Sequence, residues 1–232
     1  MGATVLITRE ERPGERGLGE ELGLKLVFEP LTSSKTLDAG RQTPEALATN
    51  HNPQTTNIAF TSRNAIEALK QANLLNELRG KNIWCVGPVT ASALGDIPHH
   101  VSPGTTGEDL ARFMLDSGVS GAVLHICGEP HRPELRATLE RAGCDVKEWI
   151  VYETVPVEAE IPEETIDAVA FFSPAAVKQF KALGWTESLH VPYVAIGPTT
   201  ASELSPSSCT VSSEASFRGV LETTRRILNV QL

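Results

Sequence analysis

Short apolar runs alternate along the chain with longer stretches in which apolar residues recur at helical spacing. The apolar runs predict strands at residues 4–8, 26–30, 57–61, 82–86, 122–126, 145–151, 168–172 and 193–196. The stretches between them predict helices at residues 64–78, 106–117, 133–142, 175–183 and 216–228. A strand followed by a helix, repeated in this way, predicts an α/β fold with a mostly parallel sheet and helices on both of its faces.

The same local sequences occur twice along the chain. Residues 86–94 match residues 196–204 at six of nine positions, an offset of 197 − 87 = 110, and residues 58–66 resemble residues 169–177 at an offset of 111. A weaker third match, at an offset of 120, relates Arg12, Pro13, Glu20 and Gly23 to Arg132, Pro133, Glu140 and Gly143. A repeat of this length is a whole domain, so the sequence predicts two similar domains.

Two domain arrangements agree with these repeats. In the first, residues 1–115 and 118–232 fold separately. In the second, the middle of the chain, about 36–152, forms one domain, and residues 1–31 complete the sheet begun by residues 157–232. The polar stretches 32–56 and 155–165 look like connectors and would cross between the domains in the second arrangement.

The chain is acidic, and its negative charge disfavours some classes of binding partner. Its 232 residues carry 20 Lys and Arg against 29 Asp and Glu, a net charge of −9. That charge disfavours nucleic acid or an anionic membrane surface as the partner. The N-terminal apolar run is too short for a signal peptide or a membrane helix, and no long apolar surface stripe indicates an obligate dimer. We therefore expect a cytoplasmic monomer that binds a small molecule.

Cysteines and histidines give no metal motif in the sequence. The cysteines are scattered without a C-x-x-C pair, and we expect buried, reduced thiols with no histidine ligand set nearby: Cys85, Cys127, Cys144 and Cys209. His125 is expected to be half-buried in a strand and His131 solvated. The chain also lacks the glycine-rich and serine-hydrolase motifs, so no nucleotide or other cofactor is indicated.

Four predicted strand-to-helix turns carry small hydroxyl residues, at 61–64, 87–90, 173–176 and 197–200. Parallel strands bring such turns to one edge of the sheet, where helix N-termini offer free N–H groups and a favourable dipole to an anion. The alternative interpretation is that each hydroxyl only caps its helix. Arg9, Arg63, Arg132 and Arg136 in or after turns are candidates for binding carboxylates or are simply solvated. Tyr152 is either a hydrogen-bond donor facing a cleft or a packing residue.

Eight segments, taken in order, resemble the uroporphyrinogen-III synthase family. They are residues 5–9 (VLITR), 60–65 (FTSRNA), 86–92 (VGPVTAS), 104–110 (GTTGEDL), 126–129 (ICGE), 149–154 (WIVYET), 171–174 (FFSP) and 196–201 (IGPTTA). The similarity extends over the whole chain. One departure is Cys127, which stands where many members of the family have arginine; another is arginine at position 63 where some members have it at the position of Asn64.

The resemblance implies two α/β domains joined by a two-stranded connector. It selects the second arrangement, with one domain from residues 1–31 and 157–232, the other from residues 36–152, and connectors at 32–35 and 153–156. The implied activity is a step of tetrapyrrole and haem biosynthesis, the cyclisation of hydroxymethylbilane to uroporphyrinogen III with loss of water and inversion of ring D. No metal or organic cofactor is implied. The substrate would come from hydroxymethylbilane synthase, with a transient hand-over between the two enzymes.

The resemblance also implies roles for individual residues. Tyr152 is the candidate general acid for the departing hydroxyl. The implied substrate-binding residues are Thr61, Ser62, Thr90, Ser173, Thr199 and Thr200, beside the arginine candidates Arg9, Arg63 and Arg132. Two other classes of protein stay open, a two-lobed anion-binding module without turnover and an inactive relative with a regulatory role.

Overall fold

The structure is a computed structural model that describes residues 2–37, 57–204 and 209–230. Most of the predicted connector stretch 32–56 lies outside the described residues. The contacts divide the chain into two compact units, which we call unit 1 (Met1–Ser33 with Val155–Leu232) and unit 2 (Ser34–Thr154). The finer boundaries expected at 31, 36, 152 and 157 stay a prediction.

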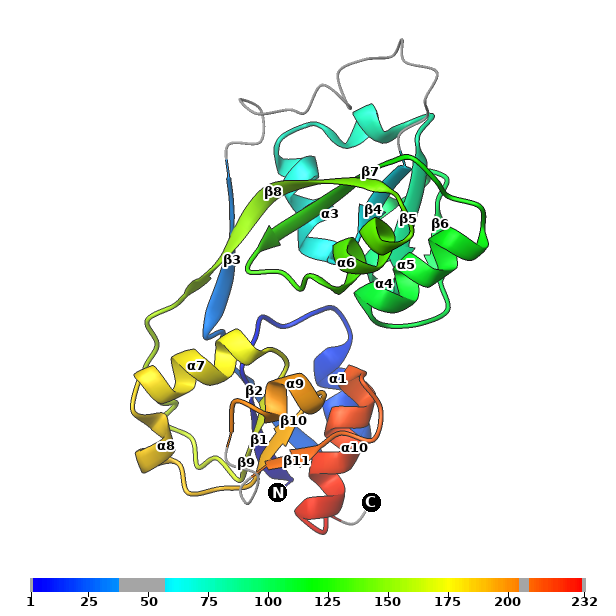
Figure 1. The fold of residues 1–232 in the computed structure, drawn as a ribbon. Helices are drawn as coiled ribbons and strands as arrows, with labels where there is room; N and C mark the ends of the chain where they lie inside the picture. The colour runs from blue at the N-terminus through cyan, green and yellow to red at the C-terminus, as the bar shows by residue number, and fades with distance from the viewer. Residues whose placement is uncertain (1, 38–56, 205–208, 231–232) are drawn as a thin grey trace. The chain divides into compact units, whose positions relative to one another are not determined.

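Unit 1 contains a five-stranded sheet in the order β11-β10-β9-β1-β2, and every pair in it is parallel (Figure 1). Its strands are β1 (Ala3–Ile7), β2 (Leu24–Phe28), β9 (Ala168–Phe171), β10 (Tyr193–Ala195) and β11 (Cys209–Val211). One face packs on α7 (Pro174–Ala182) and α8 (Trp185–Ser188), and the other on α1 (Glu15–Glu21) and α10 (Phe217–Ile227). The short helix α9 (Pro198–Ala201) follows β10.

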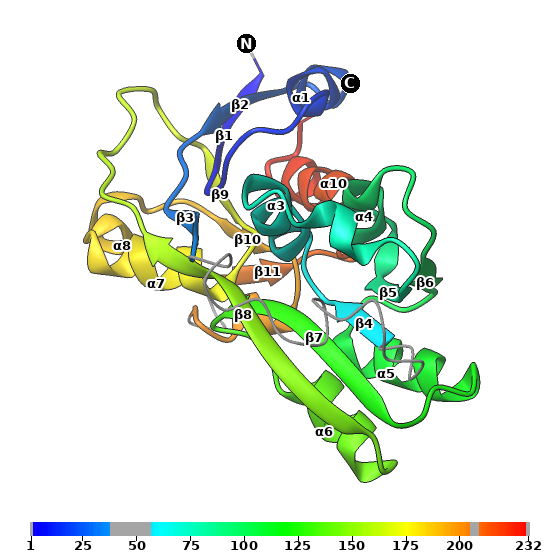
Figure 2. The same cartoon turned by 90° about the horizontal axis from the view of Figure 1, so that it is seen from above.

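Unit 2 contains a six-stranded sheet in the order β3-β8-β7-β4-β5-β6. Its strands are β3 (Thr32–Thr36), β4 (Asn57–Phe60), β5 (Asn82–Val86), β6 (His100–Ser102), β7 (Ala122–Glu129) and β8 (Asp145–Pro156). The apolar residues of α3 (Arg63–Gln71) and α4 (Gly87–Ala91) cover one face, and those of α5 (Gly107–Asp116) and α6 (Glu134–Arg141) the other. Figure 2 shows the long strands β7 and β8 running side by side.

The two sheets repeat one strand order. Unit 1 has β11-β10-β9-β1-β2 where unit 2 has β6-β5-β4-β7-β8. Strands β9 and β4 start the matching Phe-x-Ser segments, and β1 and β7 precede the segments related by an offset of 120. The shared order confirms the internal repeat, and the mostly parallel sheets between helices confirm the predicted α/β fold class.

Several element predictions were wrong in detail. The predicted helix 64–78 is broken after α3, because Asn73 has a left-handed φ of 58° that ends the helix before η2 (Leu75–Leu78). Another short helix, η3 (Ser92–Leu94), continues α4. The polar strand β3 and the three-residue strands β6 and β11 were not predicted, because they are too short or too polar to show an apolar run. Within the described residues, no helix is both long and apolar enough to cross a membrane.

Candidate functional site

The turn after β4 places two hydroxyl residues at the carboxyl edge of the unit 2 sheet. Ser62 is the N-cap of α3, with an extended backbone, and its Oγ accepts a hydrogen bond from the Asn64 N–H at 3.2 Å. Thr61 precedes it and hydrogen-bonds with a neighbouring strand, since its Oγ1 lies 2.9 Å from Nε2 of His125. The capping interpretation therefore holds for Ser62, and it leaves the Ser62 hydroxyl open to a further donor.

That donor is Tyr152, whose hydroxyl donates to Ser62 Oγ at 2.9 Å. In a regular strand Tyr152 would share a face with Ile150 and Glu148, two and four residues earlier. A register shift opposite Cys127 and Gly128 pairs Gly128 with Tyr152 instead, so the phenol ring joins Trp149 and Val151 in the core beneath α3. The irregularity in β8 thus turns Tyr152 toward Ser62.

Gly128 makes room for this ring. A Cβ atom built on Gly128 would lie 2.2 Å from Cζ of Tyr152 and 2.4 Å from both Cε atoms. Any side chain at this position would therefore displace the phenol. Because the pair is so close, Tyr152 is only 8% exposed.

The surroundings of Tyr152 keep its phenol protonated. Burial raises the pKa of Tyr152 above its usual value of 10.0, and the hydrogen bond with Ser62 offsets only part of this effect. A neutral phenol is able to donate a proton or a hydrogen bond throughout the neutral pH range.

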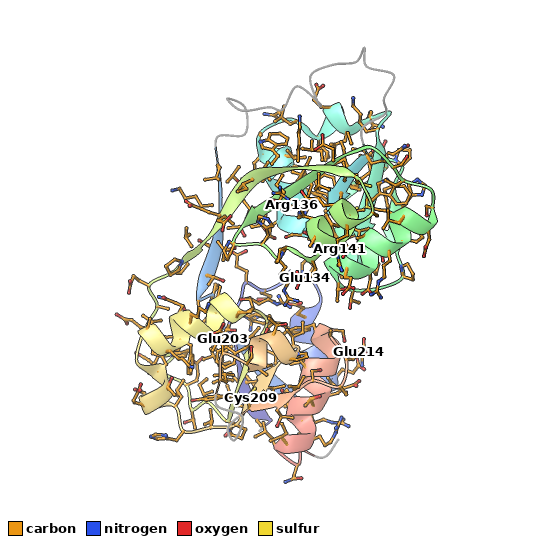
Figure 3. The ribbon with its side chains drawn as sticks, in the orientation of Figure 1. Glu134, Arg136, Arg141, Glu203, Cys209 and Glu214 are labelled. Carbon is orange, nitrogen blue, oxygen red and sulfur yellow. The ribbon has the colours of Figure 1, made fainter. Side chains whose placement is uncertain are left out.

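A polar network lies on the opposite face of β7 and β8. His125 and Glu148 are paired across the strands, and Nε2 of His131 lies 3.0 Å from Oε1 of Glu148. Arg136 on α6, labelled in Figure 3, donates to the other carboxylate oxygen at 3.0 Å. Burial raises the pKa of Glu148, but the hydrogen bonds from Arg136 and His131 outweigh it and the pKa is lowered.

Three expectations about this network were wrong. His125 is fully buried rather than half-buried, and burial lowers its pKa to about 4. His131 is held by Glu148 rather than solvated. Cys127 was expected to have no histidine ligand set nearby, yet its sulfur lies within 4.8 Å of a nitrogen of each of these two histidines. The fold rather than sequence spacing brings these three side chains together.

The other predicted residues of unit 2 are Arg63, Thr90 and Arg132. The Arg63 Nε lies 3.4 Å from Glu67 Oε1 in an i, i+4 ion pair on α3. Thr90 on α4 is buried, with 6% exposed. Arg132 is exposed in the loop between β7 and α6.

In unit 1 the equivalent turns carry the remaining hydroxyl residues. Ser173 caps α7 and accepts from the Ala176 N–H at 3.1 Å, as Ser62 caps α3. Thr199 is exposed at the start of α9, whereas Thr200 is buried, with 4% exposed. These three residues follow β9 and β10, so they lie at the carboxyl edge of the unit 1 sheet.

Arg9, also in unit 1, is bound by neighbouring side chains. Its guanidinium makes two hydrogen bonds to the Glu15 carboxylate, at 3.0 and 2.5 Å. It also lies over the rings of Phe172 and Phe217, 4.6 and 4.8 Å from their centroids. In this structure Arg9 therefore packs the end of β1 against α1 and α10.

Comparison with known proteins decides the family. The family model described as uroporphyrinogen-III synthase HemD matches residues 16–220. The chain belongs to the uroporphyrinogen-III synthase family. The resemblance noted in the sequence is thereby confirmed.

Solved structures of uroporphyrinogen-III synthases have the same fold. The Helicobacter pylori enzyme is 19% identical, with a TM-score of 0.67, and the alignment covers 98% of this chain and all (100%) of that one. A substituted form of the Thermus thermophilus enzyme is 18% identical, with a TM-score of 0.62 and coverage of 98% and 99%. No protein of curated function matches the chain.

Sequence reasoning missed two residues that shape this candidate site. Gly128 belongs to the quoted segment 126–129, but only the three-dimensional pairing shows that the Tyr152 ring lies against it. His125 positions Thr61 through a contact between residues 64 positions apart. Period-two alternation could have placed His125 and Cys127 on one face, although not beside Thr61.

Proposed function

We propose that this chain closes hydroxymethylbilane to uroporphyrinogen III and that Tyr152 is the acid that assists loss of the hydroxyl group. Membership of the uroporphyrinogen-III synthase family supports the activity. The observation that carries the role of Tyr152 is its hydrogen bond to Ser62, at the edge of the sheet where parallel α/β folds bind ligands.

The chemistry requires a proton at the hydroxymethyl group. The carbon–oxygen bond breaks, the electron pair goes to oxygen, and the hydroxyl leaves as water with the proton that the phenol supplies. The electron-rich pyrrole stabilises the resulting azafulvene, which the substituted carbon of ring D attacks to give the spiro intermediate. The bond between that carbon and the bridge to ring C then breaks, the bridge carbon bonds to the unsubstituted α-carbon of ring D, and this α-carbon loses a proton, which balances the proton given by Tyr152.

Because the pyrrole expels the group readily, much of the catalysis would come from holding the flexible chain in a ring-closing shape. We therefore expect Tyr152 to assist the reaction and no single residue to be indispensable.

The substrate carries eight carboxylates, while the protein has a net charge of −9. Local donors must therefore hold the carboxylates, and the N-termini of α3 and α7 supply uncharged ones. The proposed binding residues are Arg9, Thr61, Ser62, Arg63, Thr90, Arg132, Ser173, Thr199 and Thr200. Among them Arg9 would need to exchange Glu15 for a substrate carboxylate.

The proposal includes the setting of the reaction. We infer a cytoplasmic monomer that receives hydroxymethylbilane, by transient hand-over, from hydroxymethylbilane synthase. The acidic composition, which disfavours an anionic membrane surface as a partner, supports this inference.

The test is an assay with freshly generated hydroxymethylbilane and separation of the product isomers. The expected product is the type III isomer, formed faster than the substrate closes by itself. Formation of the type I isomer alone, at the spontaneous rate, would contradict the proposed activity. Saturable binding of hydroxymethylbilane in the same experiment, without turnover, would instead indicate the anion-binding module.

A further inference from the structure

Three side chains with metal-binding atoms meet on the α6-covered face of the unit 2 sheet. His125 and Cys127 lie two positions apart in β7, so they share a face, and His131 returns to it from the loop that follows. One nitrogen of each histidine and the Cys127 sulfur all lie within 4.8 Å of one another. Glu148 adds a carboxylate from β8, directly opposite His125.

The separations suit a tetrahedral ion. Oε1 of Glu148 lies 3.0 Å from Nε2 of His131 and 3.6 Å from Nδ1 of His125. Nitrogen and oxygen ligands at about 2.1 Å from a tetrahedral zinc ion are roughly 3.4 Å apart. The two separations lie on either side of this value, so an ion between Glu148 and either histidine requires only small side-chain movements.

A second observation concerns the unpaired nitrogen of His125. Its Nδ1 is buried and has no hydrogen-bond partner within the described part of the chain, and the residue is 0% exposed. The 3.6 Å to Glu148 is too long for a hydrogen bond. A buried polar atom of this kind is costly, and a bound cation would satisfy it.

The other nitrogen of each ring is already occupied. Nε2 of His125 contacts Thr61 Oγ1, and Nδ1 of His131 lies 2.9 Å from the Gly128 carbonyl oxygen, to which it must donate. Both rings are thus oriented by hydrogen bonds from outside the cluster, as is usual for metal-ligating histidines. Glu148 is oriented in the same way by Arg136, which holds Oε2 and leaves Oε1 facing the histidines.

We propose that His125, Cys127, His131 and Glu148 bind one zinc ion. Thiolate, imidazole and carboxylate donors in a four-coordinate set suit zinc, while magnesium and calcium prefer oxygen ligands alone. One thiolate and one carboxylate balance the two charges of the ion. The ion replaces the thiol proton of Cys127, which leaves to solvent, and no electron is transferred.

The ion has a structural role in this proposal. Four protein ligands close a tetrahedral zinc site and leave no position for substrate. The ion would tie the ends of β7 and β8 together, beside Thr61 on one side and Gly128 on the other. It reaches the site past His131 and Glu148, whose side chains are partly exposed at 19% and 17%.

The experiment titrates the full-length chain, stripped with a chelator, with Zn²⁺ by calorimetry and with Co²⁺ by absorption. We expect one ion per chain, a thiolate-to-cobalt charge-transfer band with the intense visible bands of tetrahedral Co²⁺, and a higher thermal midpoint with Zn²⁺. Cys127→Ser should abolish the charge-transfer band. His131→Ala, which changes a loop residue, should weaken Zn²⁺ binding by more than the roughly 10- to 100-fold that loss of a supporting group costs.

The controls are Cys209→Ser and His190→Ala, a thiol and an exposed histidine in unit 1. Both should bind Zn²⁺ as the unchanged chain does. The proposal is overturned if the folded chain shows no thiolate band with Co²⁺, or if Cys127→Ser and His131→Ala bind as tightly as the unchanged chain. The second result would mean that the ion binds elsewhere. The first would leave His131 and Glu148 as a hydrogen-bonded pair without a metal.

Discussion

The ends of corresponding strands differ sharply between the two units. In unit 2, β7 ends near Gly128 and the neighbouring strand lays Tyr152 against it. In unit 1 the corresponding strands are β1 and β2, and just beyond their last residue pair, Ile7 and Phe28, the Leu31 N–H donates to the Thr8 carbonyl at 3.4 Å. Thr8 and Leu31 therefore lie just past the ends of β1 and β2, the region of unit 1 that corresponds to the ends of β7 and β8 in unit 2.

The two pairs of residues make different contacts. Leu31 is fully buried in the apolar core of unit 1, and the Thr8 hydroxyl donates to the Ala170 carbonyl at 2.9 Å. The unit 1 pair is thus self-contained and joins neighbouring strands. In unit 2 the smaller glycine admits an aromatic ring, and the phenol reaches a helix cap. The repeated scaffold thus has an apolar side chain at this end of unit 1 and a buried phenol hydrogen-bonded to a helix cap at this end of unit 2.

Substitution of Gly128 should have the largest effect, since it removes the feature that distinguishes unit 2. Gly128→Ala would place a methyl group 2.2 Å from the Tyr152 ring. We expect turnover to fall at least as far as in Tyr152→Phe, and the free energy of unfolding to fall by about 1–3 kcal/mol from overpacking. Turnover assays and urea unfolding measure the two effects.

The matched control is Gly17→Ala in α1, where the added methyl group meets no atom within 4 Å. It should leave turnover unchanged and stabilise the chain by roughly 0.5–1 kcal/mol. If Gly128→Ala keeps full turnover, the close contact with Tyr152 has no catalytic meaning.

Removal of the Tyr152 hydroxyl should have the second-largest effect. Tyr152→Phe should lower turnover by about 10- to 100-fold, less than the largest losses of a general acid because the pyrrole expels the hydroxyl readily. The control is Tyr193→Phe in unit 1, whose hydroxyl donates to the Leu189 carbonyl within the core. That variant should lose stability and keep its turnover per folded molecule. Equal turnover in Tyr152→Phe and the unchanged chain would remove the acid role.

The pH profile tests the same group without a substitution. Because burial raises the pKa of Tyr152 above 10.0, the proton donor is present from neutral pH up to that value and is lost only above it. Turnover by the unchanged chain should therefore show no decline attributable to this phenol below about pH 10. A decline near pH 8 that Tyr152→Phe abolishes would show a lowered pKa instead.

The core strands, the helix caps and the repeat could be predicted from the sequence, because each of them shows in short stretches of the chain. The strands of the core, the capping serines Ser62 and Ser173 and the repeated domain follow from apolar periodicity and short-range hydrogen bonds. The face on which Tyr152 lies could not be predicted, because alternation assigns it to the side of Glu148 and the register shift reverses this. The pairing of Arg9 with Glu15 was also missed, since a turn residue and a helix residue six positions apart meet only after α1 packs.

The ion pair of Arg9 and Glu15 lies in unit 1. We expect its removal to change the stability of the chain rather than its turnover. Arg9→Ala leaves Glu15, which is 8% exposed, without its charged partner, and should reduce the free energy of unfolding by about 3 kcal/mol. Arg9→Ala with Glu15→Gln should recover part of this loss, since no unpaired charge remains. A higher KM in that double variant would show a direct contact of Arg9 with substrate; an unchanged KM would limit Arg9 to packing.

Removal of the serine caps of α3 and α7 should have the smallest effects, and it compares the two units at equivalent positions. Ser62→Ala and Ser173→Ala each remove one side-chain cap, so each should reduce the free energy of unfolding by about 1 kcal/mol. Only Ser62 also accepts the Tyr152 hydrogen bond, whose loss at about 0.5–1.5 kcal/mol corresponds to a roughly 2- to 13-fold fall in turnover. Ser173→Ala should keep turnover within about 2-fold if its hydroxyl contributes little beyond the cap. Equal falls in both variants would mean that the two caps bind substrate alike, and that the phenol adds nothing through Ser62.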